Sequence, residues 1–320
     1  MKTGTSSSLV IVTPIYEDVD VACRLFGELR EVLGPNIYIV AVDDGSIRHP
    51  VNVANLHAAN VDGVVISLKR NVGHQRAIAI GLNYVADLLP KAKQIVIMDS
   101  DGEDLPTAVP ALLSSLGQPD VDMVVAQRKS RVETLRFRAF YVVYKAMFKL
   151  LSGHTISFGN FMALKPNALK RMVAMQELWI HVAGCALSSK LRIDACSLDR
   201  GPRYSGQSKM SFVGLALHGF RGLMVFAEDV LVRVGIACTF VAAFSIVGSA
   251  VAIILKLSNY ATPGWFSVAL GILLLVFLQT GTVTLMTLML TGVVRGSLVV
   301  NVSYEDFIDN VTQASDAAKD

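Results

Sequence analysis

Two long apolar stretches in the last third of the chain limit how it can fold. Residues 234–255 and 265–291 contain no Asp, Glu, Lys or Arg, and each exceeds the roughly 20 residues with which a helix crosses a bilayer core. A pair of buried helices in a soluble core is the alternative, but core helices seldom extend this far without a polar face. The pattern therefore predicts a hairpin of two transmembrane helices.

The charges that flank these stretches predict their orientation. Arg221 and Arg233 precede the first stretch and Arg295 follows the second, whereas the connection between them carries only Lys256. Because positively charged loops stay on the cytoplasmic side, both ends of the hairpin are expected in the cytoplasm. The first apolar run does not have the form of a signal peptide, so the N-terminal region is expected there too.

The remaining composition excludes several classes of protein. The chain has 320 residues and a net charge of +3, so no nucleic-acid partner is expected. The four cysteines have no metal-ligand spacing and are expected to be reduced in the cytoplasm. No G-x-G-x-x-G follows the first apolar run and no Walker-type glycine loop occurs, which argues against a dinucleotide oxidoreductase or a P-loop ATPase.

Residues 9–127 alternate short β-branched runs with segments of helical spacing, which is typical of a βαβ series with a mainly parallel sheet. Ligands of such sheets bind outside the carboxyl ends of the strands. The polar motifs of this chain follow the predicted strands at that edge, at residues 14–17, 43–46, 69–73 and 99–103.

The fourth predicted strand ends in an acidic turn, QIVIMDSDGED, which contains Asp99, Asp101 and Glu103. Carboxylate oxygens suit Mg²⁺ or Mn²⁺, and Mg²⁺ in proteins usually keeps waters and bridges to substrate phosphates. A solvated turn is the alternative for an isolated D-x-D. With the other motifs at the same edge, the turn predicts a Mg²⁺ or Mn²⁺ site for a diphosphate, with Asp99, Asp101 and Glu103 as metal ligands.

Five motifs occur in a fixed order, TPIYED, AVDDGS, SLKRNVGHQRAIAIGL, MDSDGED and RYSGQSK, and the two apolar stretches follow them. This ordered set resembles the GT-A glycosyltransferases of family 2, and more narrowly the polyprenyl-phosphate glycosyltransferases, which include dolichol-phosphate mannose synthase and bacterial undecaprenyl-phosphate sugar transferases. The resemblance implies an α/β fold: a Rossmann-like GT-A catalytic domain with a mainly parallel sheet, interfacial helices and two C-terminal transmembrane helices.

The resemblance also implies the domain organisation and the location. A cytoplasmic GT-A domain is expected at 1–210, interfacial amphipathic helices at 211–233, the transmembrane hairpin at 234–291 and a cytoplasmic tail at 292–320. The protein is then an integral protein of the bacterial inner (plasma) membrane. A homo-oligomer is expected because relatives can assemble through the C-terminal region, but the tail is equally compatible with a frayed end.

For the nucleotide, the resemblance implies that Asp43 hydrogen-bonds the base and that the residues after the first strand border the base and ribose. A tight turn and a strand exit are the alternatives. The helix that begins near Gly73 can hold an anion at its N-terminus, or Asn71 can simply cap it. The expected nucleotide-binding residues are Pro14, Tyr16, Glu17, Asp43, Asp44, Gly45, Arg70, Asn71, Gly73 and Ser100.

The catalytic residues are likewise expected from the family pattern, with two departures. Gly102 stands where the family usually has Leu, which is expected to loosen the turn, and Asn160 replaces an aspartate. General-base catalysis is therefore in doubt, although a phosphate monoester is largely a dianion at neutral pH and already a competent nucleophile. The expected catalytic residues are Asp99, Asp101, Arg128, Arg131, Asn160, Arg203, Ser208 and Lys209.

The function implied by the resemblance is inverting, metal-dependent transfer of a sugar from a UDP- or GDP-sugar to undecaprenyl or dolichyl phosphate, to make a lipid-linked monosaccharide for the cell envelope. A processive synthase is one alternative, although QELWI around Trp179 lacks the arginine of the Gln-x-x-Arg-Trp motif. A non-catalytic, membrane-anchored nucleotide-sugar-binding scaffold is another. The sugar, the nucleotide and the polyprenol stay open.

Overall fold

The computed structural model describes residues 8–128, 135–205, 219–260, 262, 264–296 and 303–314. The chain divides into two compact units. The first comprises Met1–Arg138, Ile156–Val225 and Asn301–Asp320, and the second comprises Ala139–Thr155 and Phe226–Val300. The first unit thus includes C-terminal residues that the sequence analysis assigned to a separate tail.

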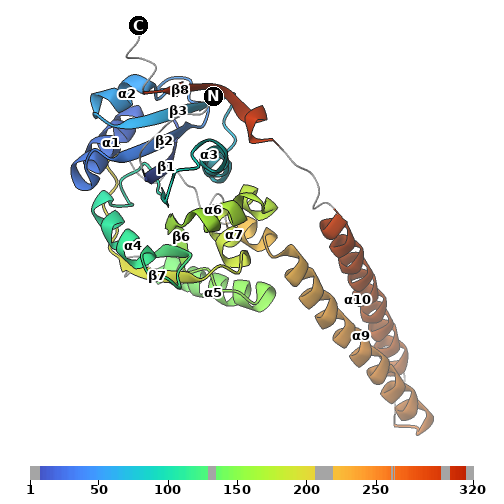
Figure 1. Cartoon of the computed structure of the whole chain (residues 1–320). Coiled ribbons are helices and arrows are strands. Elements are labelled where there is room, and N and C mark those ends of the chain that lie inside the picture. The colour runs from blue at the N-terminus through green and yellow to red at the C-terminus, as the bar shows by residue number, and fades with distance from the viewer. Residues whose placement is uncertain are drawn as a thin grey trace. The chain divides into compact units, whose positions relative to one another are not determined.

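An eight-stranded sheet forms the first unit (Figure 1), in the order β7-β5-β6-β4-β1-β2-β3-β8. β1 runs parallel to β2 and β4, β2 to β3, and β5 to β7, whereas β6 and β8 are antiparallel to their neighbours. This mostly parallel sheet confirms the predicted α/β class. The strands are β1 (Leu9–Ile15), β2 (Ile37–Asp43), β3 (Asp62–Leu68), β4 (Gln94–Ile97), β5 (Met123–Arg128), β6 (Phe158–Leu164), β7 (Ile193–Leu198) and β8 (Ile308–Gln313).

Helices cover both faces of the sheet, because successive side chains of a strand point to opposite faces. Val10 and Val12 of β1 lie in the core under α3, α6 and α7, whereas Ile11 lies in the core under α1, α2 and α4. Burial on both sides explains the near-continuous apolar sequence of β1 and β2. The helices are α1 (Val19–Leu33), α2 (Val53–Ala58), α3 (His74–Leu88), α4 (Val109–Leu116), α6 (Pro166–Val173) and α7 (Val182–Ser188), with short 3₁₀ turns at Pro106–Ala108 and Gln176–Trp179.

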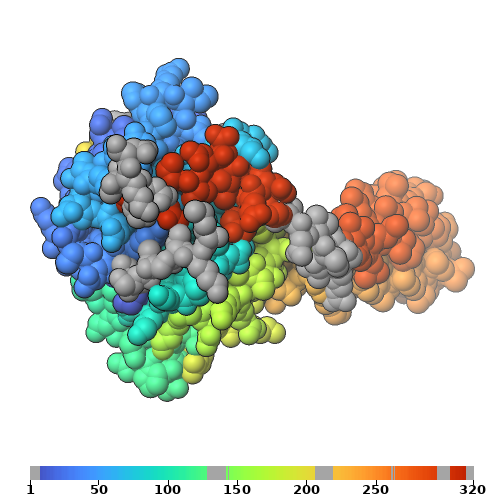
Figure 2. Space-filling model, turned by 45° about the horizontal axis from the view of Figure 1, so that its top comes forward, coloured from blue at the N-terminus to red at the C-terminus, as the bar shows by residue number. Residues whose placement is uncertain are grey.

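The end of the chain is an ordered part of the sheet. A 3₁₀ turn, η3 (Tyr304–Phe307), leads into β8, which pairs with β3 and forms the edge of the sheet. Lys69 is bound twice, because its backbone N–H donates to Phe307 O at 3.0 Å and its Nζ donates to Asp306 O at 3.0 Å. Figure 2 shows this red segment seated on the blue N-terminal part of the unit. Residues 303–314 are therefore not a frayed end.

The second unit contains most of α5 (Leu135–Ser152), from Ala139 onward, and two long apolar helices, α9 (Ala227–Leu257) and α10 (Trp265–Gly296). The segments Ala227–Leu257 and Trp265–Val293 have mean hydropathies of 2.4 and 2.1, and their most apolar windows are 11% and 0% buried. A core helix of a soluble protein would be mostly buried. The two helices are therefore candidate membrane spans, and they contain the stretches predicted at 234–255 and 265–291. Of the predicted interfacial segment, 211–233, residues 219–224 are helical, residues 227–233 are the first part of α9, and residues 211–218 lie outside the described residues.

Candidate functional site

The acidic turn, residues 99–104, follows β4 at the carboxyl edge of the sheet. Asp104 Oδ2 accepts the backbone N–H of Asp99 at 2.9 Å, and Asp101 Oδ1 accepts that of Glu103 at 3.0 Å. Ser100 Oγ donates to Pro14 O at 3.1 Å, which ties the turn to the exit of β1. The turn is thus a defined structure, held by two of its own carboxylates and by the exit of β1.

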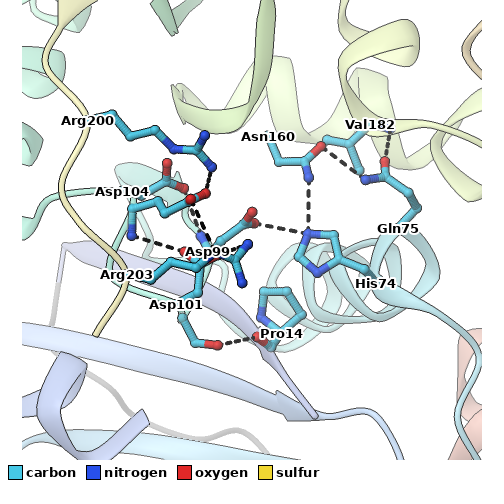
Figure 3. Close-up of polar contacts among 12 residues, drawn as sticks. Pro14, His74, Gln75, Asp99, Asp101, Asp104, Asn160, Val182, Arg200 and Arg203 are labelled. Carbon is cyan, nitrogen blue, oxygen red and sulfur yellow. Dashed lines mark hydrogen bonds and ion pairs between the residues drawn. The ribbon is translucent and has the colours of Figure 1, made fainter. Parts of the chain in front are cut away.

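Cationic side chains cover this turn (Figure 3). Arg203 Nη2 lies 2.8 Å from Asp101 Oδ2 and its Nε lies 3.2 Å from Glu103 Oε1, while Arg200 forms an ion pair with the same Glu103. His74 Nε2 lies 3.0 Å from Asp99 Oδ1. The structure therefore brings Arg203 to the predicted acidic residues and adds Arg200 and His74, which the sequence analysis did not select.

The ionisation of the turn depends on these neighbours. Burial raises the pKa of Asp101, and the nearby charge of Asp99 raises it further, whereas Arg203 and Arg200 act in the opposite direction. Burial also lowers the pKa of Arg200. Closely spaced carboxylates in a partly desolvated turn favour a positively charged partner, which guanidinium groups supply here.

The donor set of the turn fits a metal with two protein carboxylates better than one with three. Within the described ranges, no three His, Cys, Asp or Glu side chains are grouped so as to hold a metal ion. Glu103 binds the two arginines instead of completing a cage with Asp99 and Asp101. A two-carboxylate set is what Mg²⁺ commonly uses when substrate phosphates and waters supply its other ligands.

Asn160 on β6 joins the turn through His74 (Figure 3). The backbone N–H of Val182 donates to Gln75 Oε1 at 2.7 Å, so the Nε2 of Gln75 faces Asn160 Oδ1 at 3.2 Å. The Nδ2 of Asn160 then lies 3.1 Å from His74 Nε2. Because a backbone N–H can only donate, it fixes both amide orientations. Asn160 therefore turns its Nδ2 toward His74 Nε2, the same nitrogen that lies beside Asp99, and the two contacts require different protonation states of that nitrogen.

A pocket lies beside the turn. It is small, with a volume of about 30 Å³. The pocket joins the acidic turn to the ends of β5, β6 and β7, so Asn160 and Arg200 share one concave surface with the carboxylates. Its lining consists of Asp99, Glu103, Asp104, Ala126, Gln127, Gly159, Asn160, Phe161, Leu198, Asp199 and Arg200.

The two aspartates after β2 bind backbone N–H groups. Asp43 is 2% exposed, and its two oxygens accept from Ser46 N at 2.9 Å and Val51 N at 2.8 Å. Asp44 is 3% exposed and accepts from Val72 N at 2.7 Å and Gly73 N at 3.0 Å. Burial raises the pKa of Asp44, against the effect of these two bonds. Both carboxylates fold the loops that border the predicted nucleotide site.

Glu17 plays the same part for the loop after β2. Its carboxylate accepts from Ile47 N at 2.8 Å and His49 N at 3.0 Å, and also from Arg48 N. The Ile47 bond is the largest of the effects that lower the pKa of Glu17. The neighbouring Tyr16 is 47% exposed, so of the two residues it is Tyr16 that presents its side chain to solvent beside the β1 exit.

The loop before α3 packs against the turn after β2. A Cβ on Gly45 would lie 2.4 Å from the carbonyl carbon of Arg70, and Gly45 has a φ of +72°, so only glycine fits there. α3 begins at His74 with Gly73 as its N-cap and without a side-chain cap bond. The alternative interpretation that Asn71 caps this helix is therefore wrong, because the N-cap residue is Gly73 and, in the part of the chain that the structure describes, no side chain accepts from the first N–H groups of the helix.

Some predicted residues fall where the structure gives no side chain. Arg128 is the last residue of β5, and its side chain is not described. Arg131, Ser208 and Lys209 lie outside the described residues. The arginines that the structure does place at the turn, Arg200 and Arg203, come from one short segment after β7, DRGPR, whose two arginines three residues apart were the signal available in the sequence.

Comparison with known proteins gives consistent matches. The model of glycosyl transferase family 2 matches residues 10–187. The uncharacterized glycosyltransferase sll0501 of Synechocystis sp. is 25% identical over 229 residues, which cover 68% of this chain and 69% of that protein. The undecaprenyl-phosphate 4-deoxy-4-formamido-L-arabinose transferase of Shewanella sediminis is 23% identical over 212 residues, which cover 64% of this chain and 62% of that protein.

Among solved structures, the chain resembles glucosyl-3-phosphoglycerate synthase from Mycobacterium tuberculosis, in its complex with Mn²⁺, UDP and glucosyl-3-phosphoglycerate. The TM-score is 0.50 at 15% identity, and the match covers 71% of this chain and 80% of that one. At this identity the likeness shows a common fold.

Proposed function

Because the chain belongs to glycosyl transferase family 2 and is a glycosyltransferase, we propose that it transfers a sugar from a UDP- or GDP-sugar to the phosphate of a membrane polyprenol. The observation that carries the proposal is the acidic turn at the carboxyl edge of the sheet, with Asp99 and Asp101 beside the guanidinium groups of Arg200 and Arg203. Anionic and cationic groups are both present, as a metal-bound diphosphate requires.

Asp99 and Asp101 hold a divalent cation, Mg²⁺ or Mn²⁺, in this proposal. When bound, the cation acts as a Lewis acid on the diphosphate oxygens and stabilises the charge that develops on the leaving group. With a cation at Asp101, the side chain of Arg203 would be available to the diphosphate, since a guanidinium group binds phosphate oxygens in a bidentate manner. A synthase with a similar fold has been solved with Mn²⁺ and UDP, which supports a divalent cation and a nucleoside diphosphate in this proposal.

The residues of this chain then orient the reactants. The amide N–H of Asn160 donates to a sugar hydroxyl, because the Gln75 chain fixes its direction. No proton transfer is assigned to Asn160, since an amide is not a base at neutral pH. The acceptor phosphate is its own nucleophile as a dianion, and attack on the anomeric carbon opposite the diphosphate inverts its configuration.

Two features support a lipid acceptor. The chain carries two candidate membrane spans, which a soluble acceptor does not require. A relative whose match covers 64% of this chain is named as an undecaprenyl-phosphate 4-deoxy-4-formamido-L-arabinose transferase. In this proposal the protein is an integral protein of the bacterial inner membrane, with its GT-A domain in the cytoplasm and residues 211–233 at the interface.

The test is transfer of radiolabel by the full-length protein purified in detergent. A panel of UDP- and GDP-sugars is incubated with undecaprenyl phosphate in Mg²⁺, in Mn²⁺ and in EDTA. We expect organic-extractable label from one donor, and we expect that label to be lost in EDTA and in Asp101→Asn. The control variant Asp62→Asn should retain the label, because the exposed side chain of Asp62 lies at the start of β3, at the other end of the strands. Label in a long polysaccharide would indicate a processive synthase. Nucleotide binding without transfer would indicate a scaffold.

A further inference from the structure

The arginine segment, residues 200–204, has a second attachment beyond the acidic turn. The hydroxyl of Tyr204 donates to Glu28 Oε2 at 2.5 Å, and Glu28 lies on α1. Arg24, one helical turn earlier, binds Glu28 Oε1 at 2.9 Å, and its guanidinium carbon lies 4.1 Å from the centroid of the Tyr204 ring. The tyrosine therefore meets both a hydrogen-bond acceptor and a cation on one helix face.

The ring of Tyr204 also occupies the space that Gly102 leaves open. A Cβ on Gly102 would lie between 2.6 and 2.7 Å from three ring atoms, and Gly102 has a φ of +85°. Both facts exclude a larger residue without displacement of the ring. The sequence analysis interpreted Gly102 as a loosened turn. The structure shows instead that this glycine is the contact surface for Tyr204.

Two backbone hydrogen bonds fix the segment to the same turn. Gly201 N donates to Glu103 O at 3.0 Å, and Tyr204 N donates to Asp101 O at 3.0 Å. These bonds bracket the part of the chain that carries Arg203. The segment is thus held on one side by the turn and on the other by α1, whose inner face is buried through Leu25 and Phe26.

The attachment to α1 uses side-chain groups other than those that pair with the carboxylates of the turn. Tyr204, Glu28 and Arg24 make no contact with the carboxylates of Asp99 or Asp101 in the bonds that join them. Exchange of Arg203 for a cation at Asp101 would therefore leave the Tyr204 contact in place. A segment anchored in this way keeps its arginines beside the turn when they lose their carboxylate partners.

We propose that Tyr204 is a positioning residue for sugar transfer, which with Glu28, Arg24 and Gly102 holds Arg200 and Arg203 where a nucleoside diphosphate binds. The inference rests on the proposed function. Its chemical consequence is that the tyrosine hydroxyl strengthens donor binding without contact to the donor, because arginines that are already in place lose less conformational freedom when the diphosphate binds.

The test compares Tyr204→Phe with Tyr84→Phe in the detergent-purified full chain. Tyr204→Phe removes the hydroxyl and keeps the ring on Gly102. Tyr84→Phe removes another buried hydroxyl, one that bonds Gln313 far from the turn. Hydrogen exchange of the 199–205 peptide and binding of UDP with Mn²⁺ are measured first, because neither needs transfer to occur.

For Tyr204→Phe we expect about tenfold faster exchange in the 199–205 peptide, since a local contact is lost without global opening. We also expect about tenfold weaker UDP binding and, where transfer is measured, about a tenfold higher KM for the donor with kcat within about twofold. Hydrogen exchange of the β1 peptide should be the same in Tyr204→Phe and in the wild type. Tyr84→Phe should match the wild type in exchange of the 199–205 peptide, in UDP binding and in the KM for the donor. Glu28→Gln retains an acceptor for the hydroxyl and should lie between the wild type and Glu28→Ala.

Unchanged exchange in Tyr204→Phe would overturn the attachment, and faster exchange with unchanged UDP binding would overturn its role at the site. An additive loss in Tyr204→Phe with Glu28→Ala would also contradict a shared contact. If the wild type transferred no sugar, the proposed function would fail, whereas exchange and UDP binding would still decide the role of Tyr204.

Discussion

Two sets of carboxylates follow strands of the same sheet, and they differ in what they bind. The first set accepts hydrogen bonds from backbone N–H groups of neighbouring loops and consists of Glu17, Asp43 and Asp44. The second set faces histidine and arginine side chains and consists of Asp99, Asp101 and Glu103. Both sets belong to acidic motifs that look alike in the sequence.

The difference lies in which partners can leave. A backbone N–H cannot move away from its carboxylate unless the loop itself unfolds, and a buried polar group without a partner is costly. An arginine side chain can rotate to another acceptor. The first set therefore maintains loop structure, whereas the second can exchange its guanidinium partners for a cation. Substitutions should accordingly lower stability in the first set and activity in the second.

Asp101→Asn gives the sharpest test and the largest expected effect. The amide keeps the shape of the side chain and the acceptor for Glu103 N, but it loses the charge that the cation requires. We expect a fall in kcat of about 10²–10³-fold, the range for loss of one group that stabilises charge in a transition state. The melting temperature should stay close to that of the wild type. Steady-state transfer assays with thermal unfolding measure both.

A variant with full transfer activity would contradict the proposed metal site. A large fall in melting temperature would indicate that Asp101 maintains loop structure, like the carboxylates of the first set. Asp62→Asn serves as the matched control, because it removes one exposed carboxylate from the opposite end of a strand.

Asp44→Ala tests the other half of the comparison. Asp44 is 3% exposed, and its removal leaves the N–H groups of Val72 and Gly73 without their acceptor. Each unsatisfied buried group costs about 1–3 kcal/mol, so we expect a loss of about 2–4 kcal/mol in the free energy of unfolding. Chemical denaturation measures it. An unchanged midpoint of the denaturation curve would show that the Asp44 carboxylate does not stabilise the loop before α3.

The positions of the strands along the first part of the chain could be predicted, because each of these strands has a local sequence pattern. Buried parallel strands are apolar throughout and end in polar residues, so β1 to β5 were recognisable. β7 is only half buried and gives no such pattern. β8 pairs with β3 across more than half of the chain, and no local pattern can reveal a partner at that distance.

The candidate site shows the same limit. The sequence located the acidic turn and Arg203, because their spacing within a motif is informative. It did not show that the oxygens of Asp43 face Ser46 and Val51, since a strand-end carboxylate can turn either way. The role of Gly102 was also hidden, because it depends on the ring of Tyr204 about 100 residues later.

Asn160→Asp adds a carboxylate to the second set and asks whether the reaction needs a base there. The new carboxylate would still accept from Gln75 and would face His74. If the acceptor phosphate attacks as a dianion, kcat should change by less than about tenfold, whereas a missing general base is worth about 10²–10⁴-fold. A gain of that size in transfer assays would contradict a reaction without a base, and Asn160→Gln controls for the change in shape.

Asp122→Asn examines a carboxylate outside the two sets that combines both kinds of partner, a backbone N–H and a guanidinium group, and it has the smallest expected effect. Asp122 accepts from the backbone N–H of Arg192 at 3.1 Å and from its Nη2 at 2.7 Å. The side-chain bond from Arg192 is the main cause that lowers the pKa of Asp122 to about 2. Because the folded pKa lies below the unfolded value, this contribution to stability is present above about pH 4 and is lost as the pH falls towards 2.

The variant should therefore melt a few degrees lower than the wild type at pH 7, since pairs at the surface contribute little, and the difference should shrink at pH 3. Asp194→Asn, at an exposed position of β7, controls for the loss of charge alone. A difference in melting temperature that stays constant with pH would mean that the ionisation of Asp122 does not contribute to its contact with Arg192. A difference in melting temperature that decreases from pH 7 to pH 3 would show that a guanidinium group can also maintain loop structure, provided that the backbone N–H of the same arginine binds the carboxylate. Arg203 differs in this respect, because it binds Asp101 and Glu103 through its side chain.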